Sequence, residues 1–201
     1  MNQHHSNNPF DPGYYNEIEL RKIGFKSVGS NVLIAKNNTI IGPENIQIGN
    51  NVRIDGFCSF IVPGDGSLIL GSNIHIGGYC FLSAHNGIKI DDLSTLSQGV
   101  KIYTRNDDYS GQFLTNPTVP EIYRGVSYGP VHLLRHSVIG SNSIILPDII
   151  IGIGVSVGAQ SLVKSNLDNW GVYAGSPTKK IKERSKQLLT LEQSYLDTLN
   201  N

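Results

Sequence analysis

An aliphatic residue recurs every six positions along most of this chain, and a small or acidic residue usually follows it. The clearest stretches cover residues 48–60, 70–88, 90–102 and 133–163. A period of six fits neither an α-helix nor a single alternating strand. It favours a solenoid in which three hexads make one triangular coil, with each aliphatic side chain stacked inward on its equivalents in neighbouring coils.

Glycine supports this interpretation. The chain has 22 glycines, and several directly follow the aliphatic position, as in Ile48-Gly49 and Ile151-Gly152. The sharp corner between two flat sides of a coil favours a residue with little or no side chain. The glycines are therefore expected to belong to an ordered all-β solenoid of short parallel strands.

Composition narrows the function classes. Lys+Arg and Asp+Glu number 16 each, so no net field attracts nucleic acid or an anionic membrane. No run of about 18 apolar residues predicts membrane insertion, and the amino-terminal residues lack the pattern of a secretory signal. We expect a cytoplasmic protein, with Cys58 and Cys80 as reduced core thiols.

Three parts are expected along the chain. Residues 1–27 form a tail with a short helix near Ile18 and Ile23, and residues 28–176 form the solenoid. Residues 177–201 have apolar side chains at near-helical spacing, which predicts a helical cap over the open end of the solenoid. One long departure from the repeat, residues 104–130, is expected to be a functional loop.

A flat prism face makes a poor pocket, so a cleft needs this loop or a neighbouring chain. No phosphate-binding motif, zinc-ligand cluster or nucleophile elbow appears, and no metal is expected. Among six histidines, His85 sits at a break in the repeat and is the candidate general base. The others are expected to be tail or surface residues: His4, His5, His75, His132 and His136.

The hexads resemble those of the bacterial hexapeptide-repeat acyltransferases. That resemblance implies a left-handed parallel β-helix, an acyl-coenzyme A co-substrate, and a homotrimer with its sites between subunits. The sugar O-acetyltransferases of this superfamily carry a catalytic histidine on the coil that begins the long loop, whereas residues 102–111 here contain none. Segments 102–111, 114–120, 140–147 and 173–182 are instead similar to the N-acyltransferases of dTDP-4-amino-4,6-dideoxyglucose in the viosamine and anthrose pathways.

This second resemblance implies particular site residues. Asp107, in the segment Asn-Asp-Asp-Tyr-Ser-Gly, matches a carboxylate that contacts the sugar amine. Asp108, Tyr109 and Glu121 are its expected companions in substrate binding. The superfamily lays coenzyme A along the late coils, which implies binding by Ser141, Ser143, Ala159, Ser161, Lys164, Pro177 and Lys180.

Chemistry favours one reaction over its rivals. A neutral amine already has a lone pair and needs orientation more than a base, whereas a sugar hydroxyl needs a general base. We therefore predict an acetyl-CoA-dependent N-acetyltransferase that acts on dTDP-4-amino-4,6-dideoxyglucose for a surface polysaccharide such as O-antigen. An O-acetyltransferase with His85 as base is the alternative. A noncatalytic β-helix scaffold is the second alternative.

Overall fold

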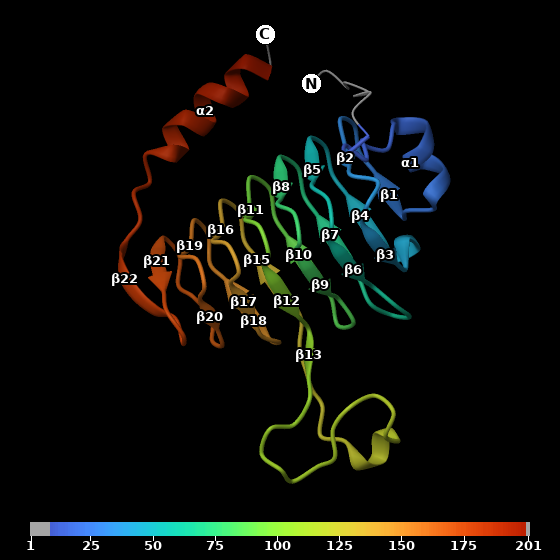
Figure 1. Ribbon diagram of the computed structural model, residues 1–201. Coiled ribbons are helices and arrows are strands. Elements are labelled where there is room, and N and C mark those ends of the chain that lie inside the picture. Colours follow the sequence, from blue (N-terminus) through green and yellow to red (C-terminus); the bar gives the residue numbers. More distant parts are fainter. Residues whose placement is uncertain (1–8, 200–201) are drawn as a thin grey trace.

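The computed structural model describes residues 9–199, so His4 and His5 lie outside the described part of the chain. It confirms the predicted fold, a parallel β-solenoid of about seven turns with one helix near each end (Figure 1). Three sheets form the flat sides of the prism, and the strands that neighbouring coils contribute pair in parallel. The sheets have six, eight and six strands, and successive strands of one sheet come from successive coils.

The strands are short. The first sheet contains β1 (Ser27–Val28), β4 (Ile46–Ile48), β7 (Leu68–Leu70), β10 (Ile88–Ile90), β15 (Val131–Leu133) and β18 (Ile149–Ile151). The second contains β2 (Leu33–Ile34), β5 (Val52–Ile54), β8 (Ile74–Ile76), β11 (Thr95–Leu96), β16 (Val138–Ile139), β19 (Ser156–Val157), β21 (Gly171–Ala174) and β22 (Lys179–Glu183). The third contains β3 (Thr39–Ile41), β6 (Ser59–Ile61), β9 (Phe81–Ser83), β12 (Lys101–Tyr103), β17 (Ile144–Ile145) and β20 (Leu162–Val163).

The core consists of columns of aliphatic side chains, as the six-residue period predicts. In the second sheet, Ile54, Ile76 and Leu96 lie in register and are fully buried. The middle residue of a strand such as β5 or β8 points outward, because side chains alternate between the two faces. Cys58 and Cys80 are both buried and form no disulfide.

The three edges of the prism carry different structures, and we name them here. The helix edge joins the first and second sheets and includes residues 71–73, 91–94 and 134–137. The groove edge joins the second and third sheets and includes residues 55–58, 77–80, 97–100, 140–143 and 158–161. The loop edge joins the third and first sheets and includes residues 84–87 and the long loop 104–130.

The amino-terminal helix covers the first coil. Helix α1 (Glu17–Ile23) begins with a capping box, in which Asn16 and Glu19 bind each other's backbone N–H groups, and it ends at Gly24 with a φ of 90°. Its one buried side chain, Leu20, packs into the core cluster of the solenoid. The short helix predicted around Ile18 and Ile23 is confirmed.

The carboxyl-terminal tail differs from the expected helical cap. Strand β22 pairs antiparallel with β21 and covers the edge of the second sheet. Helix α2 (Leu188–Leu199) then runs back along the helix edge (Figure 1). Its Glu192 binds Arg135 and, at 2.9 Å, His136, which is therefore buried beneath the helix instead of lying on a free face.

The long loop extends away from the prism (Figure 1). Strands β13 (Arg105–Asn106) and β14 (Ser127–Tyr128) pair antiparallel at its base and set it off from the coils. A 3₁₀ turn, η2 (Glu121–Tyr123), lies within it, and a second, η1 (Pro43–Asn45), lies between β3 and β4. Within residues 9–199, no helix has the length and apolarity needed to span a membrane.

Candidate functional site

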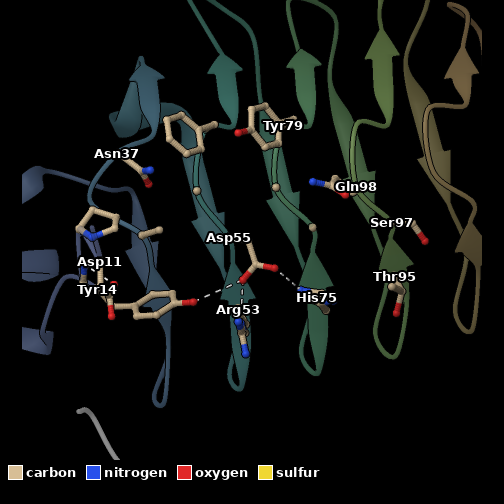
Figure 2. Close-up of a pocket in the computed structure, with 17 residues that line it drawn as sticks. Asp11, Tyr14, Asn37, Arg53, Asp55, His75, Tyr79, Thr95, Ser97 and Gln98 are labelled. Atoms are coloured by element: carbon tan, nitrogen blue, oxygen red, sulfur yellow. Dashed lines mark hydrogen bonds and ion pairs between the residues drawn. The ribbon is translucent and has the colours of Figure 1, made fainter. Parts of the chain in front are cut away.

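A groove of about 610 Å³ lies over the second sheet beside the groove edge (Figure 2). Its floor is a row of outward side chains on successive strands, Arg53 on β5, His75 on β8 and Thr95 on β11. One side is formed by the segment around Asp11 and Tyr14, which pairs antiparallel with the first coil at Ala35. The other side is formed by residues of the groove edge.

A charged cluster occupies the groove near its amino-terminal end (Figure 2). The Asp55 carboxylate accepts a hydrogen bond from Arg53 Nε at 2.8 Å and from Tyr14 OH at 3.4 Å, and it lies 2.8 Å from His75 Nε2. Burial disfavours the charged form of Asp55, but the bonds from His75 and Arg53 outweigh it and lower the pKa of the carboxyl group.

This cluster leaves the groove without surplus positive charge. Arg53 is paired with Asp55, and Asp11 adds a second carboxylate to the lining. A strongly anionic ligand therefore needs cations from outside this lining. The sequence interpretation placed His75 on an ordinary surface and did not select Arg53 or Asp55. The sequence held one partial signal: Arg53 and His75 each lie between two inward aliphatic residues, which marks both side chains as outward-facing.

The groove continues along the same edge into the late coils. Ser97 and Gln98 line its carboxyl-terminal end, and Ser141 and Ala159 occupy the corresponding corners of the next two coils. Both are at least partly exposed. Two of the residues predicted to bind coenzyme A therefore form a row that leads directly out of the groove.

Other residues predicted to bind coenzyme A lie elsewhere or face inward. Ser143 and Ser161 are buried, and each hydroxyl donates to the carbonyl oxygen of Gly158, at 3.0 Å and 2.7 Å. These two hydroxyls shape the corner turns. Lys164 follows β20 and so lies on the loop-edge side of the third sheet.

The last two residues predicted to bind coenzyme A lie in the carboxyl-terminal tail. Pro177 is exposed in the turn between β21 and β22. Lys180, on β22, pairs with Glu183 at 2.6 Å, and this hydrogen bond raises its pKa.

His85 lies at the base of the loop edge. Its Nδ1 is 3.1 Å from Ser83 Oγ, and the hydroxyl of the buried Thr104 ties Ser83 to the loop base by donating to its carbonyl oxygen at 2.7 Å. Burial, with a smaller contribution from the positive charge of Arg105, lowers the pKa of His85 below 6.5. The ring is therefore uncharged at neutral pH and has the protonation state of a base.

The predicted carboxylates lie in the loop. Asp108 accepts hydrogen bonds from Ser110 Oγ at 2.8 Å and from Gly111 N at 3.0 Å, so it stabilises a turn. Asp107 accepts one long bond, 3.4 Å, from the backbone of Asn116. Glu121 accepts from Tyr128 OH at 3.3 Å, and Tyr109 is exposed.

Within one chain the groove does not meet His85 or the loop carboxylates. The groove lies on one edge of the prism, whereas His85 and Asp107 lie on another, and the strands of the third sheet separate the two edges. Among the described residues, no group of three or more His, Cys, Asp or Glu side chains could hold a metal ion. In a single chain the groove and the loop are therefore separate features.

Comparisons with known proteins identify several relatives, although no family profile matches the chain. A dTDP-4-amino-4,6-dideoxy-D-glucose acyltransferase of Escherichia coli is 43% identical over 90% of this chain and 94% of its own. A putative lipopolysaccharide biosynthesis O-acetyltransferase of E. coli K12 is 26% identical over 75% of each chain.

Solved structures of the N-acyltransferase AntD from Bacillus cereus have the same fold as this chain. AntD in complex with dTDP and 3-hydroxybutyryl-CoA matches with a TM-score of 0.90 and 44% identity, over 94% of this chain and 98% of its own. A serine-to-cysteine variant bound to dTDP-4-amino-4,6-dideoxyglucose and coenzyme A matches with a TM-score of 0.89 and 43% identity, over 94% and 99%. An aspartate-to-asparagine variant has also been solved.

Proposed function

Because this chain belongs to the family of dTDP-4-amino-4,6-dideoxyglucose N-acyltransferases, we propose that it transfers an acetyl group from acetyl-CoA to the 4-amino group of dTDP-4-amino-4,6-dideoxyglucose. The product then enters a bacterial surface polysaccharide such as O-antigen. We place the reaction in the cytoplasm, where both nucleotide sugars and acyl-CoA are made.

The main support for this proposal is that the groove and the corners of the two following coils, at Ser141 and Ala159, form one row along the groove edge. Successive coils are about 4.8 Å apart, so the groove spans about 14 Å between the coils of Asn37 and Ser97. That length suits a nucleotide diphosphate sugar lying along the edge. The acyl-CoA arm then lies along Ser141 and Ala159, and the two ligands meet near Ser97.

The separation of the groove from the loop supports a homotrimer with three equivalent sites. The loop of a neighbouring copy would bring Asp107 and His85 to the groove edge of this chain, which no single chain achieves. It would also bring positive charge, because Arg105 and Arg124 lie at the base and within the loop. The groove lacks that charge and the diphosphate requires it.

Residue spacing in the relatives favours Asp107 and Ser97. The serine and the aspartate substituted in the AntD variants are ten residues apart in that chain. In the present sequence, Ser97 and Asp107 are the one pair in which an aspartate follows a serine at that distance. Both therefore belong in the proposed site, one at the end of the groove and the other on the loop.

The proposed reaction is direct attack. The lone pair of the neutral amine forms a C–N bond to the thioester carbonyl, the C–S bond of the resulting tetrahedral intermediate breaks, and the departing thiolate takes the excess proton from nitrogen. Asp107 accepts a hydrogen bond from the amine and holds the lone pair toward the carbonyl carbon. Backbone N–H groups of the late corners are the candidate donors to the developing oxyanion.

The test is thiol release from acetyl-CoA by the purified protein. We expect release with dTDP-4-amino-4,6-dideoxyglucose and none above background with its 4-hydroxy counterpart. Parallel reactions with 3-hydroxybutyryl-CoA identify the preferred donor. Release with the hydroxyl sugar alone would overturn the proposal.

That outcome would favour the second candidate, O-acetylation. One observation supports this candidate: His85 is uncharged near neutral pH and sits at the base of the loop. In that case His85 would take the hydroxyl proton as general base.

A further inference from the structure

One buried threonine lies where the long loop leaves the solenoid. The residues that directly follow β6, β9 and β12 occupy the same position on successive coils: Val62, Ala84 and Thr104. All three are fully buried, and the first two are apolar. The core at this position therefore accepts an apolar side chain. A buried hydroxyl is tolerated only when it is hydrogen-bonded, so the partners of Thr104 show what it does.

The Thr104 hydroxyl joins the loop to the preceding coil. It donates to the carbonyl oxygen of Ser83 at 2.7 Å and accepts from the N–H of Asn86 at 3.0 Å. These two groups are the ends of the corner that carries His85. The backbone of Thr104 adds two bonds of 3.1 Å, from its own N–H to Ser83 and to its carbonyl oxygen from the N–H of Gly129. The outgoing strand of the loop, its returning strand and the preceding coil are all held at this residue.

The rest of the loop has little that fixes its direction. Its base contains only two residue pairs, between β13 and β14, and no residue from 107 to 126 is buried. The loop nevertheless extends far from the prism (Figure 1). Asp107 follows Thr104 by three residues, so a small change at Thr104 moves the carboxylate. A displacement of about 1 Å near the reacting atoms can lower a rate about 100-fold.

We propose that Thr104 is a positioning residue for the transfer reaction, because its hydroxyl fixes the root of the loop to the preceding coil and so sets the place of Asp107. This inference rests on the proposed function, to which the role of Asp107 belongs. Thr104 is fully buried and touches no substrate. Its effect on the reaction must therefore pass through Asp107.

The experiment measures thiol release from acetyl-CoA with dTDP-4-amino-4,6-dideoxyglucose for Thr104→Val, Thr104→Ala and Thr104→Ser. Valine and alanine are native at this position in two preceding coils, so both variants should fold. Each is expected to lower kcat about tenfold and to leave the KM for acetyl-CoA unchanged. Serine keeps the hydroxyl and should stay within about twofold of the wild type.

The matched control is Ser94→Ala. Ser94 is also fully buried, and its hydroxyl donates to the carbonyl oxygen of Leu134 at 3.3 Å on the helix edge, away from the loop. This variant loses a buried hydroxyl as well, but it should keep the kcat of the wild type.

A double-mutant cycle with Asp107→Asn separates positioning from support of the fold. If Thr104 acts through Asp107, Thr104→Val should change kcat by less than about twofold in the Asp107→Asn background. The same tenfold loss in both backgrounds would overturn the inference, as would wild-type kcat in Thr104→Val or a serine variant as slow as the valine variant.

Melting of the valine and alanine variants below the assay temperature, seen by calorimetry, would also overturn it, because the hydroxyl would then be needed by the fold. All of these outcomes leave the proposed function intact. If the wild-type protein released no thiol with the amino sugar, both proposals would fall.

Discussion

At the scale of single residues, two adjacent carboxylates of the loop have different surroundings. Asp108 is engaged by two donors within its own turn, whereas Asp107 accepts only one long backbone bond and can accept more. A carboxylate with unused acceptor capacity is the better partner for a sugar amine. We therefore propose that Asp107 orients the amine, whereas Asp108 stabilises the turn that it caps.

Asp107→Asn is expected to lower kcat/KM for the amino sugar about 100-fold, because the amide loses the charge and one acceptor that orient the amine. Asp108→Asn removes the same charge one residue away but can keep the turn, and it should stay within about threefold of wild type. Steady-state kinetics with saturating acetyl-CoA distinguishes the two variants. Equal losses in both would show that loop charge, and not Asp107, matters.

His85→Asn tests whether the reaction uses a base. With direct attack, protonation of the sugar amine lowers kcat/KM at low pH and His85 contributes nothing to the profile, so wild type and variant should share one pH profile. Because the pKa of His85 is lowered, a fall in kcat/KM caused by protonation of this residue would occur below pH 6.5. If kcat/KM of the wild type falls in that range and the fall is absent from His85→Asn, the residue has a catalytic role.

The groove residues show what single-sequence reasoning misses. The period of six predicted which residues are buried, but Arg53, His75 and Thr95 meet only because their strands are in register. Their coils are 22 and 20 residues long instead of 18, since corners carry extra residues. Each extra residue shifts the phase of the six-residue repeat. The period alone therefore does not predict which outward side chains lie side by side on adjacent strands.

At the scale of elements, the long loop lies outside the coils of the solenoid. Its base is the short β13–β14 pair, and no residue from 107 to 126 is buried. The tail is less predictable from its sequence. Apolar spacing over residues 179–199 suggested one helix, but residues 179–183 form β22 because an unpaired edge of the second sheet is available to them.

Replacing residues 107–126 with Asn-Gly should close β13 and β14 as a tight hairpin. Since no buried residue is lost, we expect a melting temperature within about 3 °C of wild type and no transfer to the amino sugar. Differential scanning calorimetry and the thiol assay provide the two readouts. A large drop in melting temperature would mean that the loop supports the fold.

At the scale of the whole molecule, the sequence predicted the fold well because a solenoid repeats one local rule in every coil. The site could not be placed in the same way. The groove and the loop lie on two edges of the prism. In the homotrimer that we propose, a neighbouring copy brings the loop to the groove, so no pattern within one chain specifies their contact. We propose that one active site uses the groove edge of one copy and the loop of the next.

Mixed trimers test this claim most directly. Asp107→Asn disables the loop half, and Ser97→Trp blocks the end of the groove half; each variant alone should be inactive. If the halves come from different copies, co-expression in equal amounts under separate tags should restore about a quarter of the sites in a random mixture. Purified mixed trimers that stay inactive would contradict the claim, and activity near a quarter of wild type would establish it.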